Sequence, residues 1–95
     1  MAATHQVVLD WTDSADASAQ YNIYRSGSVG TLGTLLNAAP LVAGVTTYTD
    51  TTVTPGIWYY SAEAVENGIA SGPSNQVTVS LPPAAPTGLT VASFS

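Results

Sequence analysis

The sequence predicts an all-β sandwich of about seven short strands, and three observations support this. Apolar residues alternate with polar ones at a period of two, as on the two faces of a strand. Clusters of Gly, Pro, Ser, Asn and Asp recur about every ten residues and predict turns. No stretch carries a sustained apolar stripe at the helical period. Short strands at this spacing are typical of two packed sheets.

Six runs carry the alternation, and each places most of its apolar residues on one face. In chain order they are residues 5–11, 19–26, 46–51, 56–66, 75–81 and 87–93. We expect the first five to build the core between the two sheets. The predicted core side chains are Leu9, Trp11, Tyr21, Ile23, Tyr48, Trp58, Tyr60, Val77 and Val79.

The segments between the runs are predicted to be turns and one crossover. Asn67-Gly68 is a strong signal for a tight turn, because both residue types tolerate left-handed backbone angles. Residues 32–44 are less regular and predict a short strand near Leu35 and Leu36, followed by an irregular crossover around Pro40. A short helix is the alternative there, although Pro40 and the flanking glycines limit its length.

Composition excludes several classes of partner. Only 7% of the 95 residues are charged, and Arg25 is the single base against six acids, which gives a net charge of -5. Nucleic acid is therefore an improbable partner, since phosphate binding depends on Lys and Arg, and an anionic membrane surface is disfavoured for the same reason. The longest apolar run is far shorter than the ~20 residues of a membrane span.

The cysteine count and the first residues also limit the chemistry. There are no cysteines, so neither disulfides nor thiolate chemistry is available. The first residues lack the basic start and apolar stretch of a signal peptide, so a signal for export would lie outside this chain. We expect no cofactor.

Four stretches in order resemble a fibronectin type III domain of the bacterial kind. They are "VVLDWTDS", "AQYNIYRSG", "TTYTDTTVTPGIWYYSAEAV" and "SGPSNQVTVSLP", which look like strands B, C, E to F, and G of that family. The resemblance implies an immunoglobulin-like sandwich with Trp11 and Tyr21 in the core and Val53 before the turn between strands E and F. The family usually places a tyrosine at the position of Trp58, so that corner is expected to be altered or shifted by one residue.

The resemblance also implies a class of function. We expect a non-catalytic spacer or adhesion module of a larger exported bacterial protein, outside the cell or on its surface and beside other domains of that protein. Tyr24 and Tyr59 are expected on outward faces of neighbouring strands, where aromatic side chains could stack on sugar rings. A carbohydrate-binding module is therefore the alternative, with polysaccharide as the partner.

The C-terminus departs most from the family pattern. The family begins with strand A, announced by prolines and a Leu-x-Val pair, but here the matching text "PPAAPTGLTVAS" stands at the end. The resemblance therefore divides the chain into a sandwich lacking strand A (1–81, strands B to G), a proline-rich linker (82–86) and a strand A-like segment (87–95).

The strand A-like segment is a poor fit to its own sandwich. Strand A must start at the end of the sandwich opposite to where strand G finishes, and seven residues of strand span ~23 Å. The five steps from Leu81 to Pro86 advance at most ~17 Å. We therefore expect residues 86–93, through Pro86, Leu89 and Val91, to complete the sheet of a second copy in a head-to-tail or swapped oligomer. A disordered tail and intramolecular closure are the alternatives.

Catalytic and metal-binding patterns are weak. His5 is the only histidine and lies at the start of a strand, and no nucleophile motif accompanies it. Asp50 and Glu63 could be considered as a carboxylate pair, but each is more simply a turn or surface residue. We expect no enzyme activity. Three acids around one loop form a weak candidate for Ca²⁺: Asp10, Asp13 and Asp16.

Overall fold

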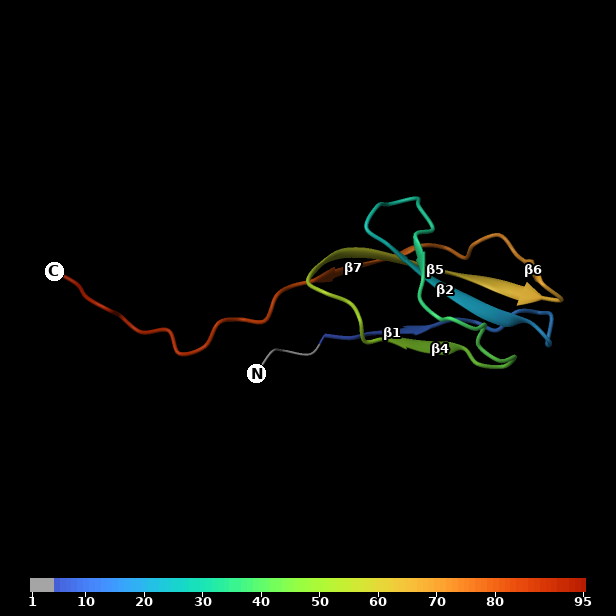
Figure 1. Cartoon of the computed structure of the whole chain (residues 1–95), viewed down its shortest axis with the longest axis horizontal. Coiled ribbons are helices and arrows are strands. Elements are labelled where there is room, and N and C mark those ends of the chain that lie inside the picture. Colours follow the sequence, from blue (N-terminus) through green and yellow to red (C-terminus); the bar gives the residue numbers. More distant parts are fainter. Residues whose placement is uncertain (1–4) are drawn as a thin grey trace.

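The computed structural model describes residues 5–95, and this part of the chain is all-β with no helix (Figure 1). Seven strands alternate with turns, as the two-residue periodicity predicts. The strands are β1 (Val7–Asp10), β2 (Gln20–Ser26), β3 (Thr34–Leu35), β4 (Thr47–Asp50), β5 (Gly56–Glu66), β6 (Ile69–Ala70) and β7 (Val77–Leu81).

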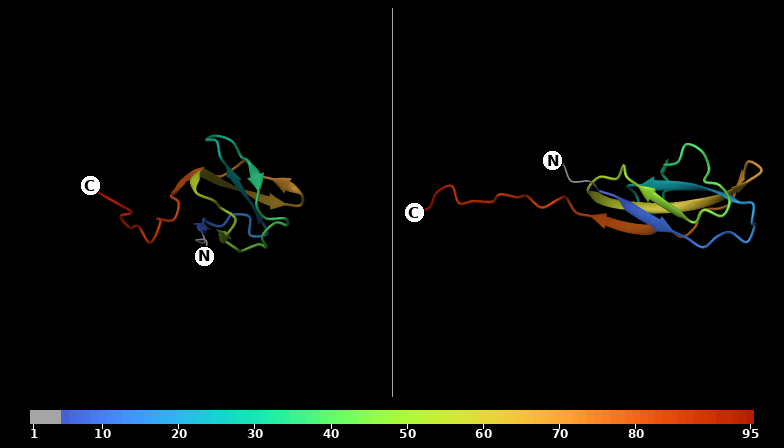
Figure 2. Two further views of the ribbon diagram at one scale, coloured as in Figure 1. Left: turned by 60° about the vertical axis from the view of Figure 1, so that its left-hand side comes forward. Right: turned by 90° about the horizontal axis from the view of Figure 1, so that it is seen from below.

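The strands form two sheets that face each other in a sandwich-like arrangement (Figure 2). One sheet contains β1 and β4, which are antiparallel with Leu9 opposite Tyr48. The other has the order β3-β2-β5-β6, and β7 also pairs with β5. The long β5 organises this second sheet, because it is antiparallel to β2 on one edge and to β7 and β6, at different parts of its length, on the other.

The core lies between the sheets and confirms most of the predicted inward positions. Tyr21, Ile23 and Tyr60 are buried, with Ile23 fully inaccessible. Trp11 is half-buried and packs its ring edge-to-face on Tyr21, with the centroids 5.3 Å apart. Four further predicted residues are half-buried: Leu9, Tyr48, Trp58 and Val79.

Val77 is the exception among the predicted core residues, because 40% of it is exposed. The alternation along β7 directs the Val77 side chain toward the space between the sheets, but the sandwich is open to solvent at this side. Two core residues come from outside the predicted set: Val7 and Val53 are both buried and pack with Tyr60. Val53 precedes the turn into β5, which is the place that the family resemblance assigns to it.

The corner before β5 is closed by the side chain of Trp58. The indole Nε1–H of Trp58 donates a 2.7 Å hydrogen bond to the carbonyl oxygen of Thr54, four residues upstream. A tryptophan can make this bond because only a donor is required. The guanidinium of Arg25 lies 4.8 Å from the centroid of the Trp58 ring and covers its face.

The stretch 32–44 adopts the predicted short strand and irregular crossover, and the helical alternative is wrong. Thr34–Leu35 pairs with β2 as β3. After it, Asn37 fixes the crossover by accepting from the amide of Ile23 and donating to the carbonyl of Tyr21. Leu41 then forms an isolated bridge with Tyr21. These bonds satisfy the backbone at the edge of β2 where β3 has already ended.

The C-terminal segment leaves the sandwich and runs away from it along the long axis of the molecule (Figure 1). Residues 82–95 contain no strand, so the sixth predicted strand does not form within a single chain. Leu89 and Val91 are 94% and 77% exposed. Intramolecular closure is therefore not the arrangement of this chain.

Candidate functional site

The buried charged cluster of the chain stabilises the corner between β4 and β5. Asp50 is 1% exposed and accepts four hydrogen bonds, from Tyr60, Arg25 and both the amide and the hydroxyl of Thr52. Burial by itself raises the pKa of Asp50, but these donors outweigh it and hold the pKa below its usual value. Every oxygen of this carboxylate is already engaged, which suits a structural role.

Glu63 does not join Asp50 as a carboxylate pair. It lies on β5 opposite Asn22, three residues from the buried Tyr60, and therefore on the outer face of the sheet. Asp50 lies between the sheets. The two carboxylates consequently face different sides of the second sheet, and the geometry of a glycoside hydrolase is absent from them.

The three acids of the calcium hypothesis are not gathered. Asp13 accepts a hydrogen bond from the buried Tyr21 hydroxyl, and burial followed by this bond raises the pKa of Tyr21. The carbonyl of Asp16 closes a local turn with the amide of Ala19. Within residues 5–95, no group of three or more His, Asp or Glu side chains is placed to hold a metal ion.

Tyr24 and Tyr59 lie on the outer face of the second sheet as predicted, but they are half-buried. Tyr24 is opposite Ser61 and Tyr59 is opposite Ser26, so the two rings occupy diagonal positions on neighbouring strands. Burial, together with the charge of Glu63, raises the pKa of Tyr24. The two half-buried rings lie at positions where side chains on neighbouring strands ordinarily stabilise a sheet.

The open side of the sandwich offers a more specific feature, an unpaired edge of β1. The amide of Trp11 bonds the carbonyl of Thr46, which extends the β1–β4 ladder by one pair. Because the bonds of an antiparallel ladder alternate, Leu9 and Val7 also point their backbone groups at β4. The N–H and C=O groups of Val8 and Asp10 therefore point to the other edge, where no strand of the described residues lies.

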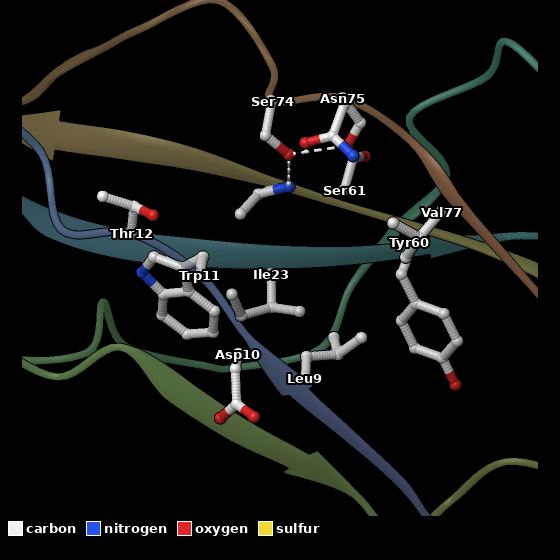
Figure 3. A pocket seen from close by; sticks show the side chains of 11 residues that line it. Leu9, Asp10, Trp11, Thr12, Ile23, Tyr60, Ser61, Ser74, Asn75 and Val77 are labelled. Carbon is white, nitrogen blue, oxygen red and sulfur yellow. Dashed lines mark hydrogen bonds between the residues drawn. The ribbon is translucent and has the colours of Figure 1, made fainter.

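A cavity of about 390 Å³ lies beside this edge, between the two sheets (Figure 3). Its floor is apolar, with Leu9, Trp11 and Ile23 directed into it, and Asp10 and Thr12 lie at the β1 side. A second cavity of about 180 Å³ shares Trp11, Thr12, Ala62 and Ser74 with the first, so the two cavities adjoin along the open side. We call this feature the β1 groove.

The wall opposite β1 is irregular, and Ser71 and Ser74 on it are already hydrogen-bonded to β5. The hydroxyls of Ser71 and Ser74 accept from the amides of Ala64 and Ala62, and the amide of Ser74 donates to the carbonyl of Ala62. A regular strand resumes only at Val77. Regular backbone pairing in the β1 groove is therefore available from β1 and not from the facing wall.

No family model matches this chain, and no curated protein matches it. Within residues 5–95 the structure has no helix that is long and apolar enough to cross a membrane.

The residues on the floor of the β1 groove could be predicted from the sequence, but the role of the facing wall could not. Leu9, Trp11 and Ile23 were predicted as core residues, and the structure brings them together as the floor of the groove. Ser74 and Asn75 complete the facing wall, but Ser74 was predicted only as a turn residue and Asn75 as the start of the run 75–81. Their contribution depends on the long-range pairing of residues 71–77 with β5, which leaves no local signal in the sequence.

Proposed function

We propose that this chain is a non-catalytic structural module, similar to a fibronectin type III domain, of a larger exported protein. In this proposal it spaces or connects neighbouring domains, and it associates with copies of itself by adding the C-terminal segment of one copy to β1 of another. The observation that carries the association is an edge of β1 that no strand within residues 5–95 pairs, beside an apolar groove. An exposed regular edge is a template for pairing with another chain.

The C-terminal segment has the chemistry that the β1 groove requires. Leu89 and Val91 alternate with smaller residues and are almost fully exposed, so one face of a strand would place both side chains on the apolar floor. Residues 82–95 carry no charged side chain, so the acidic sandwich does not repel them. Pro86 lacks a backbone donor, which favours a start of pairing after it.

The same segment is badly placed to reach its own groove. β7 ends at the end of the sandwich where β1 begins (Figures 1 and 2). A strand antiparallel to β1 must instead enter at the opposite end. The segment would therefore have to run back along the whole sandwich before pairing, whereas a second copy can present its groove directly in line.

The association is expected to be weak. One added strand buries less surface than the ~1,200–2,000 Å² of a stable protein interface. Burying the side chains of Leu89 and Val91 favours association, and ordering the backbone of the segment has an opposing entropic cost. The hydrogen bonds along β1 and the apolar contacts together must exceed that cost, so high protein concentration favours detection.

Sedimentation of the full chain at several concentrations tests the proposal. We expect association in the full chain and a monomer in the double variant Leu89→Asp, Val91→Asp, because two carboxylates cannot enter an apolar groove. The double variant Ala84→Asp, Ala85→Asp in the linker adds the same charge and should still associate. A full chain that stays monomeric at the highest attainable concentration would disprove the proposal.

A further inference from the structure

We propose that the self-association is an open head-to-tail filament and not a closed, reciprocally exchanged dimer. This inference rests on the proposed function, since it concerns the arrangement of copies that exchange the C-terminal segment. It follows from where the donor segment and the β1 groove lie on one molecule.

The first step concerns the direction of the added strand. β1 begins at the end of the sandwich from which the C-terminal segment departs (Figure 1). A strand parallel to β1 would have to enter the acceptor at the end where β1 begins. The acceptor's own linker already leaves the sandwich at that end. An antiparallel strand enters at the free end instead, and antiparallel pairing is slightly more stable per residue. The antiparallel orientation is therefore preferred.

The second step concerns the path of the linker. The C-terminal segment extends along the long axis, and the molecule measures 70 × 25 × 21 Å including it (Figure 2). Pro82, Pro83 and Pro86 stiffen the start of this path, because proline-rich linkers favour an extended conformation. The donor and the acceptor consequently lie one behind the other along this axis.

The third step concerns closure. A closed dimer needs each copy to receive the other's segment, so the two sandwiches must lie side by side in opposite directions. Each linker would then have to reverse direction between residues 82 and 88, against the stiffness of its prolines. An in-line contact instead leaves a free β1 groove at one end of the assembly and a free C-terminal segment at the other. Such heterologous contacts grow into an open filament.

The alternation of hydrogen bonds identifies which tail residues pair with β1. The backbone N–H and C=O of Leu9 point toward β4. A residue of the added segment that lies opposite Leu9 therefore makes no backbone hydrogen bond with β1. If Leu89 and Val91 face the groove floor, they occupy such positions, and the amide of Thr90 between them donates to β1. The substitution Thr90→Pro removes this donor. Ser93→Pro is the matched control. Ser93 lies an even number of residues from Leu89, so its amide also points away from β1 and its loss removes no hydrogen bond of the proposed pairing.

Analytical ultracentrifugation of the full chain distinguishes the two arrangements. We expect the mean mass to keep rising with concentration beyond two copies. Thr90→Pro should be monomeric alone but still accept a segment, so mixed equally with the unaltered chain it should reduce the mean to at most about two copies per assembly. Ser93→Pro in the same mixture should leave long assemblies.

The outcomes separate this inference from the proposed function. A fixed oligomer whose mass does not grow with concentration, and which Leu89→Asp, Val91→Asp abolishes, would overturn the filament and keep strand exchange. A monomer at every concentration would overturn both. Filaments of unchanged length in Thr90→Pro alone would overturn the inference as well, because the pairing would not use the predicted ladder.

Discussion

Asp50 shows at the scale of one residue how this lightly charged chain stabilises its fold. Its carboxylate is 1% exposed, and the Arg25 guanidinium lies 2.7 Å from its Oδ2 atom. A buried charge is tolerated when hydrogen bonds replace its hydration, and four donors do so here. The cluster joins β2, the end of β4 and β5, so it connects the two sheets at one corner.

The substitution Asp50→Asn should therefore destabilise the fold by about 3 kcal/mol or more. An amide removes the charge that Arg25 requires, and its own donors then face the hydroxyl donors of Tyr60 and Thr52. Urea unfolding at neutral pH measures the change. Asp16→Asn is the matched control in an exposed loop and should change the free energy of unfolding by less than ~0.5 kcal/mol. Equal effects of the two variants would contradict the structural role of Asp50.

The pH dependence of stability gives the same prediction a second measurement. The pKa of Asp50 is lowered on folding, so its contribution is present above the unfolded value of about 4 and is lost as the pH falls through the folded value. Burial and the hydrogen bond to Asp50 raise the pKa of Tyr60, so its contribution is lost only as the pH rises above about 10. Asp50→Asn should flatten the acid side of the profile.

At the scale of elements, Gly33 sets the entry into β3. Its backbone is left-handed, with φ at +85°, and a Cβ atom there would lie 2.2 Å from the carbonyl oxygen of Arg25. Only glycine allows β3 to approach β2 this closely. Gly30 in the same loop is also left-handed, at +79°, but a Cβ there would meet no atom within 4 Å.

Gly33→Ala should consequently destabilise the protein more than Gly30→Ala. The control has only the left-handed cost of about 1–2 kcal/mol, whereas Gly33→Ala adds a clash that must displace β3 from β2. Urea unfolding measures both values, and hydrogen exchange at the amide of Leu36, which bonds the carbonyl of Ile23, should report the loosened pairing. If both alanine variants have the same stability, close approach does not explain this glycine.

Prediction of the elements succeeded where the information was local. The five runs with clear alternation became β1, β2, β4, β5 and β7. The turn at Asn67-Gly68 was also confirmed, since both residues have positive φ. The small strand β6 was not predicted, because Ile69 and Ala70 pair for two residues only and carry no alternation. Residues 87–93 have the alternation of a strand but form none in one chain, because a strand also needs a partner.

At the scale of the whole molecule, the candidate site could be predicted only in outline. The sequence indicates a displaced strand and the residues it would present, Leu89 and Val91. The β1 groove depends on Ile23, Tyr60 and residues 71–77 meeting across two sheets, and such long-range packing leaves no periodic signal. Val77 illustrates this limit, because its parity predicts burial whereas its position at the groove leaves it exposed.

The consequence for the whole molecule is that its thermal stability should depend on protein concentration. Anything that binds the folded state and not the unfolded one stabilises the fold by mass action. In the full chain the second copy is that ligand, so the midpoint of thermal unfolding should rise as concentration rises. A chain ending at Leu81 should show a constant midpoint, because it keeps all seven strands but donates no segment.

At low concentration the two chains should unfold at the same temperature. Residues 82–95 are exposed and form no strand, so their removal costs the single molecule little. Calorimetry over a wide range of concentration measures both behaviours, with Leu89→Asp, Val91→Asp as a full-length control that should match the shortened chain. A midpoint that rises equally in all three proteins would show that association uses another surface. A constant midpoint in all three would mean that the β1 edge stays unpaired between copies.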